Sequence, residues 1–124
     1  MKTTTTLIQM TLRASGLLLL VLGLAIWTGH DQLTQIHELL GLVLVLSLWA
    51  LAFFAARARV STGLVMLAAA WGLGAAILGI VQGQLLTGDW HWTIQVLHLL
   101  IGLGAIGQGE ILGNRMRRIA EPEV

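Results

Sequence analysis

Residues 37–57 read HELLGLVLVLSLWALAFFAAR, and nothing between Glu38 and Arg57 carries a charge. An α-helix rises 1.5 Å per residue, so roughly 20 apolar residues cross a membrane core about 30 Å thick. This stretch therefore predicts one transmembrane helix. Three further uncharged windows run from Arg13 to Asp31, from Arg59 to Asp89 and from Asp89 to Glu110. The chain is expected to be all-α, with spans at about 10–28, 32–56, 62–85 and 91–114.

The composition excludes a soluble protein. Of the 124 residues, 56% are hydrophobic and 10% are charged, against about 25% charged residues in ordinary soluble chains. The four spans use nearly the whole chain, which predicts a single integral membrane domain over residues 1–124 without a soluble catalytic domain. The absence of cysteine rules out disulfides, thiolate metal sites and iron–sulfur clusters. The segment 1–28 resembles a signal peptide, but it lacks a small-residue cleavage site and is kept as the first helix.

The cations predict the orientation of the helices. Lysine and arginine occur only at the N-terminus, between the second and third spans, and at the C-terminus: Lys2, Arg13, Arg57, Arg59, Arg115, Arg117 and Arg118. The positive-inside rule makes that side cytoplasmic. We therefore expect a protein of a bacterial-type inner membrane with both termini in the cytoplasm. Trp27, Trp90 and Trp92 then lie at the outer interface as an aromatic belt. The net charge of +1 reflects this topology and does not indicate nucleic-acid binding.

The sequence repeats itself. When the second span is aligned with the fourth without a gap, the matches are His30 with His91, His37 with His98, Gly41 with Gly102, Leu42 with Leu103 and Arg57 with Arg118. When the first span is aligned with the third, Gly16 falls on Gly72, Leu17 on Leu73, Leu22 on Leu78 and Gly23 on Gly79. The repeat predicts a transmembrane up-down-up-down four-helix bundle made of two repeated helical hairpins.

His37 and His98 lie near the outer ends of parallel spans, so the repeat places their imidazoles at one depth. The two helices are diagonal neighbours in a bundle, and adjacent axes roughly 8–10 Å apart give a diagonal on the order of 11–14 Å. This distance suits an iron between the rings with a porphyrin in the bundle core. A bare zinc or copper ion needs three or four ligands, and Glu38 is rotated about 100° from His37. The alternative is a pair of structural histidines, although ionisable groups within membrane spans are usually functional.

Glycines accompany these histidines. Gly16 and Gly23, like Gly72 and Gly79, are seven residues apart and share a helical face, whereas Gly41 and Gly102 lie one turn beyond each histidine. Small residues are needed where a flat haem passes a helix. They also serve close packing of membrane helices, which is the alternative interpretation.

His30 and His91 precede the pair by seven residues, about 10.5 Å along a helix. A second haem there would collide with the first and protrude into water. The roles that remain are hydrogen bonding to haem propionates, proton handling or quinol binding, and plain interfacial histidines.

With Gly41 and Gly102, the His37–His98 pair in parallel spans resembles the four-helix membrane b-type cytochromes. This group includes bacterial quinol-linked cytochrome b subunits and eukaryotic ascorbate-reducible ones. The resemblance is architectural and covers about residues 12–118. It implies one non-covalent haem b near the outer face, with His37 and His98 as iron ligands, for one-electron transfer. Many members hold two haems near opposite faces, but the inner half of this chain has no histidine.

The implied partners are the lipid bilayer, a quinol, and a periplasmic redox protein or a larger respiratory complex. An electron-transfer protein or redox subunit is expected rather than a stand-alone enzyme. Two other functions stay open: a non-catalytic accessory subunit of a larger membrane complex, and a small metal or proton carrier that uses the four histidines. Glycine-rich faces on the third and fourth helices also leave a homodimer open.

A carrier would need a continuous polar path through the membrane. The polar candidates in the inner half of the fourth span are Gln108, Glu110 and Asn114. Glu110 is rotated about 120° from His98, so it does not share the histidine face. We expect it to reach the cytoplasmic interface or to neutralise Arg115 or Arg117.

Overall fold

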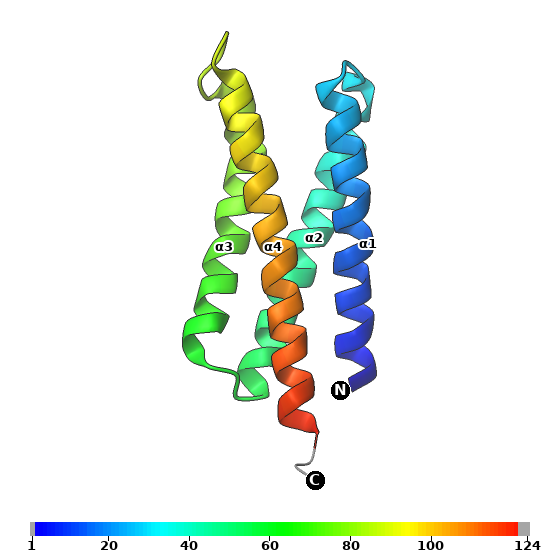
Figure 1. Cartoon of the computed structure of the whole chain (residues 1–124), viewed down its shortest axis with the longest axis vertical. Coiled ribbons are helices and arrows are strands. Elements are labelled where there is room, and N and C mark those ends of the chain that lie inside the picture. Colours follow the sequence, from blue (N-terminus) through cyan, green and yellow to red (C-terminus); the bar gives the residue numbers. More distant parts are fainter. Residues whose placement is uncertain (1, 122–124) are drawn as a thin grey trace.

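The structure is a computed structural model that describes residues 2–121, and within this range it contains helices and no strands (Figure 1). Its elements are α1 (Lys2–Trp27), the 3₁₀ turn η1 (Asp31–Leu33), α2 (Thr34–Arg57), α3 (Thr62–Val81), the 3₁₀ turn η2 (Gln82–Gln84) and α4 (His91–Ala120). Each α-helix, together with its adjoining 3₁₀ turn where it has one, is long and apolar enough to cross a membrane. The prediction of an all-α chain with four membrane-length helices is confirmed.

α1 and α4 are longer than the spans expected from the sequence. α1 begins at Lys2 rather than near residue 10, and α4 continues to Ala120 rather than ending near 114. The added turns are polar or basic. A prediction from hydropathy misses them, because it marks only the apolar part of a helix. Arg117 and Arg118 stand in the last turn of α4, where cations interact favourably with the helix dipole.

Left-handed residues help to end the first two helices. Gly29 after α1 has φ 109°, and Arg59 after α2 has φ 62°. At both positions, backbone hydrogen bonds close the six-residue loop of a Schellman motif. Glycine adopts this conformation without strain, whereas an arginine rarely does. The motifs turn the chain sharply, so that α2 returns along α1 and α3 returns along α2.

Successive helices run in opposite directions (Figure 1). One end, here called the basic end, carries Lys2, the α2–α3 turn (58–61) and the C-terminal end of α4. The other, the histidine end, carries the loops 28–33 and 82–90. α2 packs against all three other helices and α4 does likewise, but α1 and α3 do not touch among the described residues. The helices expected to be diagonal neighbours, α2 and α4, are therefore in direct contact.

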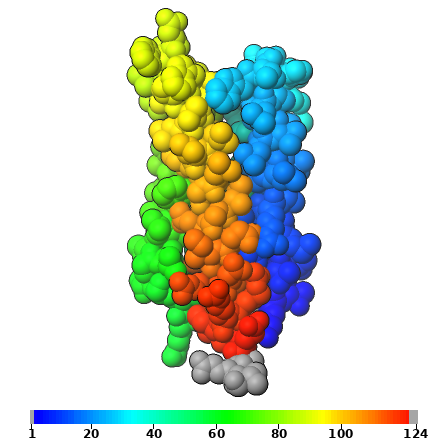
Figure 2. Space-filling model, viewed as in Figure 1, coloured from blue at the N-terminus to red at the C-terminus, as the bar shows by residue number. Residues whose placement is uncertain are grey.

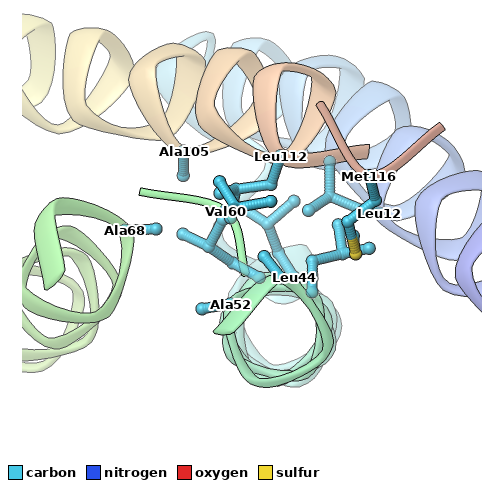
Figure 3. Packing of buried hydrophobic residues seen from close by; sticks show 11 residues of the cluster. Leu12, Leu44, Ala52, Val60, Ala68, Ala105, Leu112 and Met116 are labelled. Atoms are coloured by element: carbon cyan, nitrogen blue, oxygen red, sulfur yellow. The ribbon is translucent and has the colours of Figure 1, made fainter. Parts of the chain in front are cut away.

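The enclosed core lies in the half of the molecule toward the basic end. Figure 3 shows side chains of all four helices meeting there. The buried cluster is Leu12, Leu44, Leu48, Leu51, Ala52, Ala55, Val60, Ala68, Ala105, Leu112 and Met116. Alanines in this cluster keep the backbones of α2, α3 and α4 close together. Toward the histidine end the two hairpins separate (Figure 1).

Two tryptophans fasten α3 to its neighbours. The indole of Trp49 donates a hydrogen bond to the Ala69 carbonyl at 3.1 Å, and its ring lies against Gly72. The indole of Trp71 donates to the Ile101 carbonyl at 2.9 Å, and its ring lies in the same way against a glycine of α4. The glycines let each ring reach the backbone of the neighbouring helix, where its N–H finds an acceptor.

Candidate functional site

His37 of α2 and His98 of α4 lie close together. His37 is in the first turn of α2, and His98 is in the second turn of α4. Because both helices run away from the histidine end, the rings lie at similar depth. Their ring centroids are 6.0 Å apart and their planes are inclined by 50°, and both residues are half-buried. The structure thus brings together the two histidines that the repeat pairs.

The two rings are close enough to share a ligand once their nitrogens are turned toward it; here Nε2 of His37 lies beside Gly23 of α1. An imidazole–metal bond of about 2.0 Å, with roughly 1 Å from nitrogen to ring centre, places the two centroids about 6 Å apart. Nδ1 of His98 is buried and has no hydrogen-bond partner among residues 2–121. A buried polar nitrogen left without a partner costs free energy. A ligand at His98 would remove that cost.

Two of the glycines expected to line a cofactor, Gly23 and Gly79, lie beside the pair. A Cβ added at Gly23 would lie 3.4 Å from Nε2 of His37, and one at Gly79 would lie 3.7 Å from Cε1 of His98. These glycines of α1 and α3 flank the two rings. Gly41 and Gly102, one turn beyond each histidine, have no atom within 4 Å of the added Cβ. Larger side chains at Gly23 and Gly79 would crowd the imidazoles directly.

Gly16 and Gly72 lie in different surroundings from the other glycines expected to line a cofactor. The space beside Gly16 holds Ile106 of α4, whose Cδ1 is 2.6 Å from the position of an added Cβ. The space beside Gly72 holds the indole of Trp49. Both glycines are about 10.5 Å along their helices from the ones that flank the histidines. In this structure they serve close helix packing.

His30 and His91 are at the surface loops and not in the histidine pair. The Nδ1 atom of His30 lies 3.1 Å from the Ala25 carbonyl oxygen. Nδ1 of His91 lies 3.0 Å from the Leu85 carbonyl oxygen. Each ring therefore has a hydrogen-bonding partner in the segment that precedes it. The equivalence of the two contacts gives both histidines a loop-stabilising role at the histidine end.

The half of the molecule around the pair is only partly enclosed. Leu78 and Ile94 are the buried hydrophobic residues of α3 and α4 that lie in this half, at 9% and 8% exposure. Other inward positions near the rings, such as Gly23 and Gly79, are half-buried. Figure 2 shows a hollow between the hairpins at the histidine end. The histidine end is therefore less tightly packed than the core toward the basic end.

The residues of this site fit a haem better than a bare metal ion. No three His, Cys, Asp or Glu side chains of residues 2–121 come together as a metal site, whereas zinc or copper sites usually take three or four protein ligands. A porphyrin supplies its own four nitrogens and needs only axial ligands from the protein. His37 and His98 could supply two axial imidazoles, and Gly23 and Gly79 leave the rings free of larger side chains.

A polar network lies on the other side of the core, between α1 and α4. Arg13 and Glu110 form an ion pair at 2.5 Å, and the amide of Gln9 donates to Glu110 at 3.0 Å. Arg117 donates to the amide oxygen of Gln9. Glu110 was expected to neutralise Arg115 or Arg117, but its ion-pair partner is Arg13. The signal available in the sequence was the i, i+4 spacing of Gln9 and Arg13, which puts both on one face of the first helix.

No protein family, curated protein or solved structure matches this chain.

Proposed function

We propose that this chain is a membrane b-type cytochrome that holds one haem between His37 and His98 and serves one-electron transfer. In this proposal the two hairpins form an up-down-up-down transmembrane bundle. The observation that carries the proposal is the close pair of imidazoles, with ring centroids 6.0 Å apart and one buried nitrogen without a partner among residues 2–121. Axial ligation from opposite faces of a porphyrin requires two histidines at one depth, and two parallel helices can supply them.

His37 and His98 would be the axial ligands of a non-covalent haem b. Such a haem supplies one-electron ferric–ferrous chemistry, and two strong axial imidazoles disfavour oxygen binding to it. The protein contributes position and surroundings. Gly23 and Gly79 keep side chains away from the two rings. The buried core toward the basic end holds α2 and α4 in register, which fixes the separation of the imidazoles.

The cation distribution supports the orientation in this proposal, and the resemblance to b-type cytochromes supports the partners. With the basic end in the cytoplasm of a bacterial-type cell, the histidine end faces the periplasm. A single haem near that face cannot by itself conduct electrons across the membrane. Electrons would enter and leave on the outer side, from a quinol in the bilayer to a periplasmic redox protein or within a larger respiratory complex.

Absorption spectroscopy tests this proposal. We expect the full chain, expressed in haem-replete cells and purified in mild detergent, to be red, with a sharp Soret band and split visible bands on reduction. His37→Ala and His98→Ala should each abolish the six-coordinate spectrum. His30→Ala is the matched control, because His30 is also at the histidine end but its ring contacts the Ala25 carbonyl of α1. Colourless wild-type protein, or an unchanged spectrum in both pair variants, would refute the proposal.

A further inference from the structure

A second candidate site lies at the basic end, where the α2–α3 turn meets the last turns of α4. A pocket of about 460 Å³ opens there between Ser61, at the start of α3, and Arg115 and Arg118 of α4. Pockets that hold small ligands are roughly 300–1,000 Å³. The pocket is on the opposite side of the core from the histidine pair, and it shares no residue with that site.

The polar lining of this pocket suits an anion. Arg115 and Arg118 are three residues apart on one face of α4, both are exposed, and neither has an acidic partner within ion-pair distance among residues 2–121. Guanidinium groups bind phosphate through paired, charge-assisted hydrogen bonds. Glu121 also lines the pocket. One carboxylate against two guanidinium groups leaves the lining net positive.

The start of α3 adds donors to the same pocket. Ser61 occupies the N-cap position, but its hydroxyl makes no capping hydrogen bond, and the first turn of α3 contains no acidic residue. The first amides of a helix have no partner within the helix and carry the positive end of its dipole. Ser61 lines the pocket together with the two arginines.

The remaining lining is apolar. Val60 is buried at 7% exposure, and Leu64 is half-buried. Ile119 completes this lining and is 54% exposed. A free phosphate ion makes no apolar contacts with such a lining, whereas the glycerol and first acyl carbons of a phospholipid would cover it. The pocket is at the ends of three helices that are apolar enough to span a membrane, which is the level of lipid phosphates.

The charge distribution of the whole chain favours an acidic lipid. All seven cations belong to the part of the sequence that lies toward the basic end, while the histidine end has Asp31, Glu38 and Asp89. Basic pockets between transmembrane helices on the cytoplasmic side bind the headgroups of acidic lipids. We propose that this pocket binds the phosphate of an acidic phospholipid, held by Arg115, Arg118 and Ser61.

Native mass spectrometry of the full chain tests this proposal. We expect one phosphatidylglycerol to stay bound to protein released from mixed micelles, and phosphatidylcholine to be lost, because its choline neutralises the phosphate. Arg115→Gln and Arg118→Gln should each weaken phosphatidylglycerol binding roughly five-fold. Arg57→Gln is the matched control: this cation is at the same end but lies over the ring of Phe53, at 5.8 Å.

Two further arms separate the possible outcomes. Circular dichroism melting of each variant checks that the loss of lipid is not a loss of fold. Inorganic phosphate added in excess should displace little phosphatidylglycerol if the apolar wall contributes to binding. Equal retention of the two lipids, an equal effect of Arg57→Gln, or full displacement by inorganic phosphate would overturn the proposal. None of these outcomes depends on haem binding, so a failure of this proposal can be distinguished from a failure of the cytochrome proposal.

Discussion

Adding one methyl group at Gly113 should disturb the polar network between α1 and α4. A Cβ at this position would lie 2.5–2.7 Å from the side-chain amide of Gln9. Gln9 is only 1% exposed, so its amide has no open space into which to move. Gly113→Ala should therefore displace the amide and weaken its hydrogen bonds to Glu110 and from Arg117.

The size of the effect follows from these two hydrogen bonds. Hydrogen bonds to charged groups contribute about 1.5–3 kcal/mol each, so weakening both costs about 3 kcal/mol. Alanine is favoured over glycine within a helix by about 1 kcal/mol, which offsets part of this loss. We expect Gly113→Ala to lower the free energy of unfolding by about 2 kcal/mol.

The assay is unfolding in mixed micelles with increasing denaturing detergent, followed by circular dichroism. Gly107→Ala is the matched control on α4, because a Cβ there meets no atom within 4 Å; this variant should be unchanged or slightly stabilised. In a Gln9→Ala background, Gly113→Ala should lose its cost, since the amide it displaces is gone. Equal stability of the Gly113 and Gly107 variants, or an undiminished cost in the Gln9→Ala background, would refute the reasoning.

Three other perturbations address the remaining parts of the molecule. Gly72→Ala should cost about 1–3 kcal/mol of unfolding free energy through overpacking against Trp49, whereas Gly74→Ala, with open space beside it, should not; similar denaturation midpoints would contradict this. Gly79→Leu should crowd the histidine pair and lower the haem content per protein, while Gly74→Leu should leave it unchanged, as measured by the Soret absorbance. Thr87→Cys introduces a single cysteine into this cysteine-free chain, and it should react with a membrane-impermeant maleimide in intact spheroplasts. If Thr87→Cys stays unlabelled while a single cysteine in the α2–α3 turn is labelled, the orientation is the reverse of the one proposed.

The sequence predicted the four helices because charge-free windows of membrane length favour helices over any other regular structure. It did not predict where α1 and α4 end, because their outer turns are polar and hydropathy does not register them. α1 begins at Lys2 and α4 continues to Ala120, beyond the apolar segments. Average composition therefore marks the apolar segments and not the full length of these helices.

The sequence predicted the depth of His37 and His98 along the bundle but not the distance between the helices that carry them. The repeat placed His37 and His98 at one level, because equal spacing on parallel helices gives equal depth. A square bundle would have placed α2 and α4 on a diagonal on the order of 11–14 Å, but these helices touch. Their approach depends on small residues of the core, such as Ala52 and Ala105, and on how neighbouring side chains fill the space between helices.

The glycines show why sequence could not separate packing from a cofactor site. The repeat treats Gly16 and Gly23 alike, as seven-residue partners on one helical face. In the structure the space beside Gly16 is filled by Ile106, whereas His37 lies beside Gly23. What distinguishes them is a side chain of another helix, which is distant in sequence. Because the half toward the basic end is tightly packed, the helices stay together without a filled core at the other end. The proposed haem site therefore lies in the half that is less tightly packed.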